Sequence, residues 1–499
     1  MNLVRTVLDY AGTQHDAVAL IDGPRSISYG ELGRLVAKTA GHFGALGVSP
    51  GERVAVCLKD SWRYVVALLA IGYCGAVFAP LDWRARPAEK TRLAEWLKPI
   101  LILAEPGQAI ETSYPVIEID AAWDEAIERA EPYAGFAGDG DAPFVISSTS
   151  GTTGLPKFSA ATHRQLYFNL QARAEQVPLP QHCRHLSTAP LHFSAGRLSC
   201  FFHLYRGDTV ILHSALLSAA DYVELALRHR ANSGYVVPMT IRQLLKLAAG
   251  GGPILPFLDA LVTGGSPLAA QEKQEAARCL TPNFYERYST STTGPISILR
   301  PADMADHAAS VGRPHSFAEI EIVDEQGGPL GPNEAGSLRY RGKSLGYGLG
   351  GPGGYESSTE GFRNGWYYTG EIAALDGDGY LYLKGRISDV IIRGAAKIFP
   401  AEIEAVLQDH PAIAEAAVIG HAGASGEEEA VAFLVARQPV TTGEIVAHCR
   451  LRLTPYKIPG TIRFVASLPR NTGGKVDKAE LKKMLSAEEE AHADPNPRM

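Results

Sequence analysis

The hydrophobic positions of this chain follow two alternating spacings over its first three hundred residues. Short runs rich in β-branched residues are predicted to be buried strands. These runs lie at 53–58, 209–212, 233–237 and 259–263. Segments such as 31–46 and 222–230 place apolar residues three and four positions apart, which predicts amphipathic helices. Strands that alternate with helices indicate an α/β fold, with layers of helices around parallel sheets.

The pattern changes near Glu319. Three segments then alternate apolar and polar residues, and they are joined by turns such as Asp376–Gly379. These segments lie at 319–324, 337–342 and 379–385. They predict a β-rich subdomain that completes a large N-terminal domain with several subdomains.

A compact α+β region follows the segment GRISD, residues 385–389. It contains two helical patterns and two strand patterns, at 401–410, 415–420, 429–436 and 442–453. We therefore predict an N-terminal domain of residues 1–387 and a small mobile C-terminal domain of residues 388–485. The acidic, proline-containing stretch 486–499 is predicted to be a disordered tail.

Composition narrows the class of protein. The 499 residues are 45% hydrophobic and 20% charged, and the net charge of −7 argues against a nucleic-acid binder, which needs a basic face. The six cysteines form no CxxC pair or zinc-ligand spacing, which favours a reducing compartment. The N-terminus has no signal-peptide pattern, and the longest apolar run, 64–80, is short for a membrane span. A cytoplasmic protein without a membrane span is predicted.

The strongest candidate for chemistry is the motif SSTSGTTGLPK, residues 147–157, which follows the apolar run APFVI. Its glycines let backbone N–H groups approach a polyphosphate, its hydroxyls donate hydrogen bonds, and Lys157 adds a positive charge. It is not a Walker A loop, because Pro156 precedes the lysine where that motif needs glycine. Taken alone, the motif also fits a polar surface loop.

The motif resembles the phosphate-binding loop of the adenylate-forming superfamily, which includes acyl- and aryl-CoA synthetases, peptide-synthetase adenylation domains and beetle luciferases. Further segments resemble that superfamily in its own order over nearly the whole chain. They are LGVSPGERVAVCLKDS, YCGAVFAPLDWRARPAE, PLHFSAG, VTGGSPL, YSTSTTG, SVGRP, WYYTGEIA, GRISDVIIRGAAKIFPAEIE, LTPYKIP and LPRNTGGKVDK. The resemblance implies an ATP-dependent acid–CoA ligase that works through an acyl-adenylate, with ATP, Mg²⁺ and coenzyme A as its cofactors.

The resemblance also implies which residues bind the nucleotide. The phosphate loop contributes Thr149, Ser150, Gly151, Thr152, Thr153, Gly154 and Lys157. The turn of Gly264, Gly265, Ser266 and Pro267 lies along adenine, and the ring of Tyr288 packs on the base. Glu371 stands where the superfamily has an Asp that accepts the ribose hydroxyls, and Arg386 also reaches the ribose. A carboxylate suits a vicinal diol because its two oxygens can accept two hydrogen bonds.

Lys475 matches the lysine that approaches the reacting acyl-phosphate centre. Carboxylate and α-phosphate are both anionic, so a lysine placed on both would neutralise the charge that opposes their reaction. Ser388 in GRISD matches the hinge about which the C-terminal domain rotates. In the superfamily, one orientation brings the lysine to the nucleotide and the other brings the loop 393–400 inward to form a tunnel for the thiol.

The sharpest departure from the superfamily lies in YSTSTTG, where the usual pattern is Tyr-Gly-x-Thr-Glu. Ser291 replaces the Thr, and Thr292 replaces the Glu that helps bind Mg²⁺. Mg²⁺ uses few protein ligands and keeps several waters, so a hydroxyl could compensate in part, although a negative charge is lost. We expect retained activity with weaker metal dependence or a lower rate, and complete loss of activity stays an alternative.

The acid-binding pocket is predicted from His192 and Phe193, together with Val237, Pro238 and Gly265. His192 is also a candidate catalytic residue. No acidic residue occurs in 190–200, which disfavours an amino acid substrate. Arg197 could face a second carboxylate on a diacid, or be a solvated or interface arginine. The segment as a whole favours an apolar acyl or aryl acid.

Three functions remain open from the sequence. The first is an acid–CoA ligase acting on a small carboxylic acid, ATP and CoA, as a monomer or homodimer. The second keeps adenylation but loads an acyl carrier protein. The third is a catalytically weakened nucleotide-binding homologue, for which Thr292 is the only support. The identity of the acid and the oligomeric state are not predicted.

Overall fold

The computed structural model describes most of the chain: residues 2–134, 138, 140–149, 157–213, 218–249, 251–349, 357–358, 361–393, 396–422, 428–471 and 475–493. Only the backbone is described at 148–149, 157, 349, 357–358, 396–397, 422 and 488–493. The chain forms two compact units. Unit 1 comprises Met1–Glu319 and Tyr340–Gly365, and unit 2 comprises Ile320–Arg339 and Trp366–Met499.

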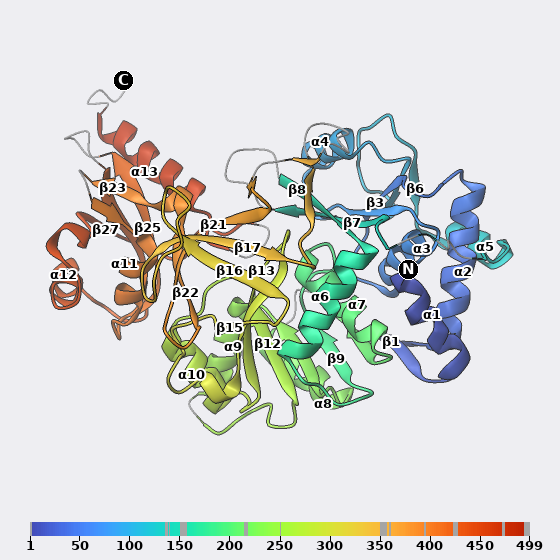
Figure 1. The fold of residues 1–499 in the computed structure, drawn as a ribbon, viewed down its shortest axis with the longest axis horizontal. Helices are drawn as coiled ribbons and strands as arrows, with labels where there is room; N and C mark the ends of the chain where they lie inside the picture. The colour runs from blue at the N-terminus through green and yellow to red at the C-terminus, as the bar shows by residue number, and fades with distance from the viewer. Residues whose placement is uncertain are drawn as a thin grey trace, which may run out of the picture. The chain divides into compact units, whose positions relative to one another are not determined.

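Unit 1 contains a nine-stranded sheet in the order β15-β14-β13-β12-β11-β9-β10-β1-β2 (Figure 1). Its strands are β1 Val18–Asp22, β2 Arg25–Ser28, β9 Arg184–Ser187, β10 Thr209–Leu212, β11 Ser233–Val236, β12 Ala260–Gly264, β13 Phe284–Thr290, β14 Gly294–Leu299 and β15 Arg313–Pro314. The run from β13 through β12, β11, β9 and β10 to β1 is parallel. Three of the four strands predicted from β-branched runs lie in this sheet.

A second sheet of unit 1 has eight strands in the order β19-β18-β8-β7-β4-β3-β5-β6. They are β3 Arg53–Cys57, β4 Val77–Pro80, β5 Leu101–Ala104, β6 Val116–Glu118, β7 Pro143–Thr149, β8 Lys157–Thr162, β18 Tyr347–Leu349 and β19 Ser357–Ser358. Its central strands are parallel, and β7 turns back into β8 as an antiparallel hairpin. The motif SSTSGTTGLPK therefore spans the end of a hairpin.

Ten α-helices connect and cover these strands in the described part of unit 1. They are α1 Leu3–Thr13, α2 Tyr29–Ala45, α3 Trp62–Tyr73, α4 Pro87–Leu97, α5 Ala121–Arg129, α6 His163–Gln176, α7 Ser194–Tyr205, α8 Ala219–Arg228, α9 Pro238–Ala248 and α10 Ala270–Cys279. The predicted helices 31–46 and 222–230 correspond to α2 and α8. A 3-10 helix, η1, covers Pro301–Asp303, and the short strand β20 covers Phe362–Arg363.

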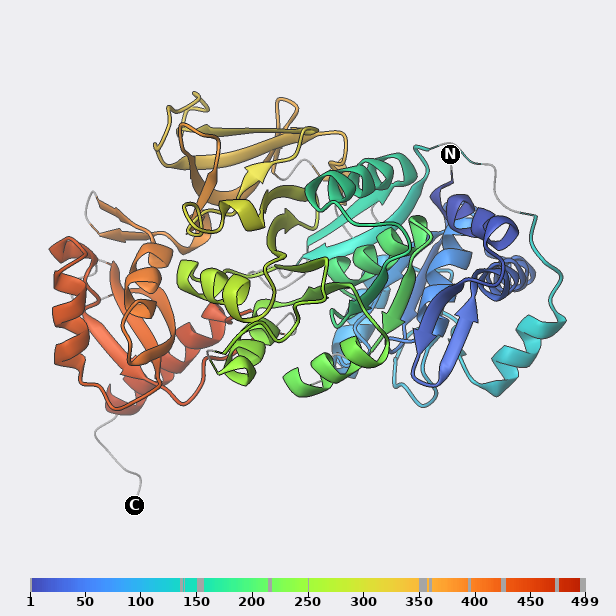
Figure 2. The same ribbon diagram turned by 90° about the horizontal axis from the view of Figure 1, so that it is seen from below.

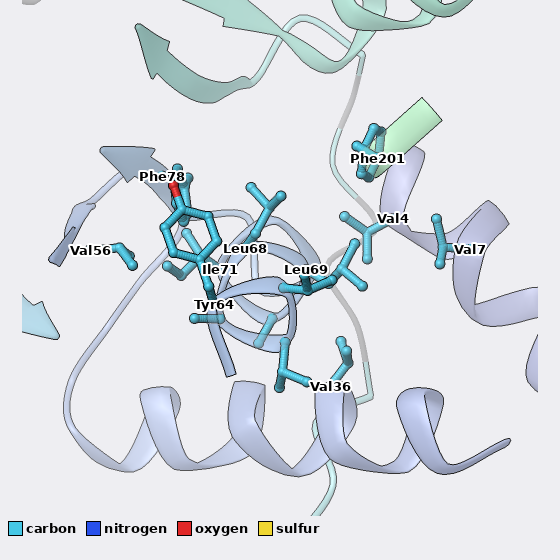
Figure 3. Packing of buried hydrophobic residues seen from close by; sticks show 14 of the residues in the cluster. Val4, Val7, Val36, Val56, Tyr64, Leu68, Leu69, Ile71, Phe78 and Phe201 are labelled. Atoms are coloured by element: carbon cyan, nitrogen blue, oxygen red, sulfur yellow. The ribbon is translucent and has the colours of Figure 1, made fainter. Parts of the chain in front are cut away.

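The main core of unit 1 lies where α1, α2, α3 and α7 pack between the two sheets. Figure 3 shows α3 crossing above α2, with Tyr64, Leu68 and Leu69 of α3 among side chains from the neighbouring elements. Every residue of α3 from Tyr64 to Gly72 is buried, which is why this helix has no polar face. The longest apolar run of the sequence is thus α3 followed by β4. Among the described residues, no helix is long and apolar enough to cross a membrane.

Unit 2 begins with a β-rich part. Strands β16 Ala318–Val323, β17 Gly336–Gly342 and β21 Trp366–Leu375 are neighbours in one sheet, and β22 Leu381–Arg386 pairs with β21. The predicted turn at Asp376–Gly379 joins β21 to β22. The expected β-rich segment is therefore confirmed as strands, although most of it belongs to the same compact unit as the C-terminal part.

The rest of unit 2 is a small α+β layer structure. A hairpin of β23 Ile391–Arg393 and β24 Ala396–Ile398 precedes a three-stranded sheet of β25 Ile413–Ala422, β26 Glu428–Ala436 and β27 Thr461–Phe464. Helices α11 Pro400–Gln408 and α12 Thr442–Arg450 pack on one face and α13 Lys478–Ala493 on the other (Figure 2). The alternation is direct, because Val418 faces the first pair of helices and Ile419 faces α13.

Three details of the sequence prediction concern unit 2. Short 3-10 helices, η2 Ile387–Asp389 and η3 Pro455–Lys457, occur in segments without a predicted element. Helix α13 extends to Ala493, beyond Ser486, where the sequence predicted the start of a disordered tail; residues 494–499 lie outside the described residues. The predicted domain boundary at 387/388 falls inside unit 2. That residues 388–485 move as a separate domain stays a prediction.

One glycine of the SVGRP segment offers a test of the packing. Gly312 has a φ of +79°, and a Cβ added there would lie 1.8 Å from the carbonyl oxygen of Ile298. Gly51 has a φ of +86° with nothing within 4 Å of such a Cβ. Gly51→Ala should cost about 1–2 kcal/mol, the cost of a left-handed residue. Gly312→Ala should cost about 1–3 kcal/mol more, because backbone must move.

The measurement is the thermal unfolding midpoint of the two variants and the wild type under one buffer. A Gly312→Ala midpoint no lower than that of Gly51→Ala would show that the β14–β15 region relaxes at no cost.

Candidate active site

The β7–β8 hairpin fixes both ends of the predicted phosphate loop. Thr149 and Lys157 are Cα partners in the antiparallel register, at the last described position on each strand. Ser150, Gly151, Thr152, Thr153 and Gly154 lie outside the described residues, as do the side chains of Thr149 and Lys157. The two described ends of the predicted loop are therefore held side by side across the hairpin.

The turn that carries Ser291 and Thr292 is fastened to β8. The backbone N–H of Gly346 donates to the carbonyl of Thr292 at 2.7 Å, and the hydroxyl of Ser159 on β8 donates to the carbonyl of Ser291 at 3.5 Å. Ser344 donates to the carbonyl of Thr293 at 2.9 Å. Because β8 begins at Lys157, the structure brings the YSTSTTG turn next to the strand that leaves the predicted phosphate loop.

Thr292 itself is buried, at 7% exposure. The neighbouring Thr290 and Thr293 hydroxyls lie 2.9 Å apart and hold the turn closed. A neutral hydroxyl fits this buried turn without the desolvation penalty that an unpaired glutamate would meet there. The substitution for the family glutamate is therefore compatible with the packing of the turn.

The predicted adenine turn follows β12. A Cβ on Gly264 would lie 2.4 Å from the carbonyl oxygen of Arg287 on β13, so only glycine fits there. Gly265 has a φ of +95°, Ser266 is half-buried and Pro267 is exposed, and the guanidinium of Arg242 donates to the Pro267 carbonyl at 3.3 Å. Tyr288 follows Arg287 on β13, beside a register shift between Tyr288 and Ser289. The turn and the tyrosine thus come from adjacent parallel strands.

His192 lies in a polar cluster that sequence reasoning missed. Its Nε2 is 3.4 Å from the Asp82 carboxylate and 3.3 Å from the Arg84 guanidinium, and its ring packs on Phe193 at 4.2 Å between centroids. Asp60 accepts the backbone N–H of Leu191 at 2.8 Å. Burial acts to raise the pKa of Asp82, but His192 and Arg84 outweigh it and hold that pKa well below its usual range.

Asp82 and Arg84 lie in the segment PLDWRARP, which resembles an N-terminal segment of the superfamily. That segment is the sequence signal that could have located this cluster.

Val237 is the half-buried N-cap of α9 and Pro238 is its buried first residue. Both therefore stand at the carboxyl end of β11, where ligands of open parallel sheets bind.

Arg197 is neither solvated nor at an interface. It is 1% exposed, and its guanidinium donates to the carbonyls of Leu191 at 3.2 Å and His192 at 3.0 Å. A further hydrogen bond goes to the hydroxyl of Ser147 at 3.1 Å. This arginine ties the PLHF segment to β7 and so to the start of the phosphate hairpin. Its Nε is buried without a hydrogen-bond partner among the described residues. The burial of Arg197 corrects its interpretation as a solvated arginine.

In unit 2, Glu371 and Arg386 are register partners on β21 and β22. The Arg386 Nε lies 3.3 Å from Glu371 Oε1. Burial raises the pKa of Glu371, and the positive charges of Arg386 and Lys475 oppose that rise. Burial lowers the pKa of Lys475, Arg386 lowers it further, and Glu371 opposes both. Three predicted site residues of unit 2 therefore interact with one another.

Lys475 is held by a tight turn. Its backbone N–H donates to Asn471 Oδ1 at 3.1 Å, and its carbonyl accepts the N–H of Asn471 at 2.8 Å. Arg470 and Val476 form an antiparallel bridge across the same turn. The backbone of Lys475 is thus fixed although residues 472–474, with Gly473 and Gly474, lie outside the described residues.

The predicted hinge, Ser388, lies in η2 and is exposed. Its hydroxyl donates to Asp389 at 3.0 Å, and Asp389 lies 3.8 Å from Lys478, which also contacts Glu404 at 2.8 Å. Gly394 and Ala395 of the neighbouring loop lie outside the described residues. The structure places Ser388 at a short exposed link, and its role as a pivot stays a prediction.

Comparison with known proteins decides the family. The family model described as AMP-binding enzyme matches residues 8–349. The family model described as AMP-binding enzyme C-terminal domain matches residues 402–475. The chain belongs to the AMP-binding enzyme family. Its similar relatives include feruloyl-CoA synthase from Amycolatopsis sp, 32% identical over 94% of this chain and 96% of the relative. Another is 2-succinylbenzoate–CoA ligase from Bacillus licheniformis, 30% identical over 93% of this chain and 96% of the relative.

Solved structures of the AMP-binding enzyme family agree. o-Succinylbenzoate CoA synthetase from Bacillus subtilis, in complex with its acyl-adenylate intermediate, is 27% identical with a TM-score of 0.85, over 96% of this chain and 97% of that one. The same enzyme with ATP and magnesium ion is 26% identical with a TM-score of 0.84, over 96% and 99%. This AMP-binding enzyme is an AMP-forming acid–CoA ligase whose substrates are a small carboxylic acid, ATP and CoA.

The charges around Lys475 predict that substitutions of Glu371 and Arg386 shift the pH dependence of adenylate formation in opposite directions. In its predicted role Lys475 neutralises the reacting anions only while it is protonated, so adenylate formation should fall as pH rises through its lowered pKa. Glu371→Gln removes a charge that supports the ammonium and should move this alkaline limb to lower pH. Arg386→Gln removes a repelling charge and should move it to higher pH.

The readout is the pH profile of acid-dependent ATP–pyrophosphate exchange at saturating substrates. Arg450→Gln, on the exposed end of α12, removes a cation elsewhere in unit 2 and should leave the limb in place. Shifts in the same direction for Glu371→Gln and Arg386→Gln would show that Lys475 does not set the limb.

Proposed function

We propose that the enzyme works in two half-reactions. In the first, a carboxylate oxygen of the acid attacks the α-phosphorus of ATP, the bond to the bridging oxygen breaks, and pyrophosphate leaves. In the second, the sulfur of the CoA thiol attacks the acyl carbon, its proton is lost, and AMP leaves with the electron pair of the broken acyl–oxygen bond. The observation that carries this proposal is the Glu371–Arg386–Lys475 set, which combines a ribose-type acceptor with two cations.

We assign the residues as follows. The hairpin from Thr149 to Lys157 binds the phosphates, Gly264 to Pro267 and Tyr288 hold the base, and Glu371 with Arg386 holds the ribose. Lys475 neutralises the meeting of carboxylate and α-phosphate. His192, buried beside Asp82 and Arg84, positions the acid's carboxylate.

Mg²⁺ belongs to this proposal. It is an oxygen-binding ion that takes phosphate oxygens and water with few protein ligands, and the Thr292 turn offers a hydroxyl in the place of the family's glutamate. The ion would screen the charge of the phosphates. Hydrogen bonds from Gly346 and Ser159 orient the turn.

The substrate class is argued from both the pocket and the relatives. His192, Phe193, Val237, Pro238 and Gly265 offer an aromatic ring, apolar side chains and exposed backbone. The relatives named above act on ferulic and 2-succinylbenzoic acids by name, and a third, from Aromatoleum aromaticum, is an indoleacetate–CoA ligase. We infer an aromatic or acyl acid rather than an amino acid.

We place CoA ahead of a carrier protein as acceptor, because every relative named here is a CoA synthase or ligase. A cytoplasmic location fits the six cysteines, all of which are free thiols. The weakened-homologue alternative keeps only the substitution at Thr292 in its favour. A screen of aromatic and aliphatic acids for ATP- and CoA-dependent AMP release tests the proposal, and no release with any acid would contradict it.

Lys475→Ala separates the half-reactions. The change should lower adenylate formation by about a hundredfold or more, by analogy with loss of an oxyanion donor. Thioester formation from supplied acyl-adenylate and CoA should be nearly unchanged, because pyrophosphate has already left. Pyrophosphate exchange and thioester release measure the two steps. Equal losses in both would contradict a role confined to the first step and, with it, the domain rotation about Ser388.

Thr292→Glu tests the metal site. Restoring a carboxylate should lower the Mg²⁺ concentration needed for half-maximal pyrophosphate exchange, since a charged ligand is gained. Thr290→Glu, in the same turn, is the matched control and should give no such gain. A variant with unchanged Mg²⁺ dependence and an intact melting curve would show that the turn no longer addresses the metal.

A further inference from the structure

A small cavity in unit 1 is lined by strongly basic side chains. It lies between α6, α7 and the strands β9, β11, β12 and β13, and its volume is about 20 Å³. Arg173 and Arg287 line it together with Tyr235, Val262, His185 and His203. Such a volume admits a water molecule or the oxygen end of one small polar group.

Within the described part of the chain, the two arginines are buried without an acidic partner. Arg173 is 5% exposed and Arg287 is 7% exposed. Among the described residues, their guanidinium groups donate only to neutral amide oxygens: Arg173 Nε to Asn169 at 2.8 Å, and Arg287 Nε to Gln176 at 2.8 Å. A buried charge without a counter-charge is costly, and two like charges are more costly still.

Burial lowers the pKa of both guanidinium groups. Burial lowers the pKa of Arg173 to about 10. Burial lowers the pKa of Arg287 to about 9, and the positive charge of Arg173 contributes to that fall. Each guanidinium keeps its proton at neutral pH, so the cavity carries two positive charges.

The remaining neighbours cannot neutralise those charges. His185 bonds Ser233 at 3.0 Å and Ser199 at 2.9 Å, and burial lowers its pKa far below the ordinary value, so it is neutral. The nearby carboxylate of Asp208 is occupied by His203 at 2.8 Å and Arg206 at 2.8 Å. The positive charges of the two guanidinium groups in this cavity are therefore not balanced by any described carboxylate.

The cavity adjoins the turn after β12, which is predicted to lie along adenine and, through Gly265, to border the acid pocket. The Tyr235 hydroxyl lies 3.5 Å from the position that a Cβ on Gly264 would take, and the carbonyl of Arg287 lies 2.4 Å from that position. Tyr288, the predicted adenine-packing residue, directly follows Arg287. A molecule seated against Gly264 and Gly265 is therefore next to the cavity, at the carboxyl ends of β11, β12 and β13.

We propose that the acid activated by this enzyme carries a second anionic group, a carboxylate at the end remote from the reacting one, which Arg287 and Arg173 bind in this cavity. The inference rests on the proposed function and narrows its substrate class. The sequence favoured an apolar acid and considered Arg197 for a second carboxylate. Both terminal nitrogens of Arg197 donate within the protein, to backbone carbonyls and to Ser147, and only its Nε has no partner. Among the described residues, Arg287 and Arg173 each donate through Nε alone, which leaves both of their terminal nitrogens for a substrate.

Matched acids test the proposal on the wild-type enzyme. Pyrophosphate exchange is measured with three sets of acids. Cinnamate is compared with para-carboxycinnamate, benzoate with the ortho, meta and para benzenedicarboxylates, and pentanoate with glutarate. At least one diacid should exceed its monoacid partner by about 100-fold or more in kcat/KM, because a monoacid leaves buried donors unpaired. Equal or better use of every monoacid overturns the inference while leaving the ligase function intact. No exchange with any acid contradicts the proposed function itself.

Variants separate binding from folding. Arg287→Gln and Arg173→Gln should raise KM for the preferred diacid about 30-fold or more, while exchange with its monoacid partner persists or improves. Arg287→Lys should keep part of the preference for the diacid that Arg287→Gln loses, since lysine keeps the positive charge. Arg228→Gln, on the exposed face of α8, is the control and should change neither acid. Equal losses for diacid and monoacid in a variant that melts like the wild type would assign these arginines a structural role and overturn the inference.

Discussion

The antiparallel register of β7 with β8 is the constraint on which the site of unit 1 depends. It holds Thr149 beside Lys157 at the two ends of the predicted phosphate loop, and it presents β8 as the surface to which the YSTSTTG turn is hydrogen-bonded. Arg197 couples Ser147 on β7 to the carbonyl of His192. The ends of the predicted phosphate loop, the Thr292 turn and the His192 segment are therefore fixed by one hairpin, and displacement of that hairpin would move all three.

Charge is distributed unevenly around the proposed reaction. In unit 2, Lys475 and Arg386 are balanced by one carboxylate, Glu371, which tunes the lysine rather than neutralising it. In unit 1, Arg173 and Arg287 are balanced by none of the described carboxylates. An enzyme that joins a carboxylate to a triphosphate gains from cations held ready before its substrates arrive, because their desolvation has already occurred during folding. The stability lost to these unpaired groups is then recovered when anions bind.

The fold was largely predictable from local pattern. The β-branched runs that became β3, β10, β11 and β12 are flanked by turn residues, and their burial on both faces explains their uninterrupted apolar character. Candidate site residues could be named from the sequence wherever a motif is contiguous, as for Gly264–Pro267, and their roles stay predictions. Arg173 and Arg287 could not be found in this way, because nothing in the sequence places α6 beside β13. Their lack of a counter-charge is a property of three-dimensional packing alone.

The substitution at Thr292 is best understood together with that packing. A glutamate at this position would have to be desolvated in a turn whose backbone oxygens already accept hydrogen bonds from Gly346, Ser344 and Ser159. Its charge would be compensated only when a metal ion is present. Threonine removes that dependence and keeps an oxygen that the proposed metal site can use. In the proposed site the cost falls on the affinity for Mg²⁺, because phosphate oxygens and water must then supply more of its ligands. The substitution at Thr292 is thus compatible with the proposed adenylation site.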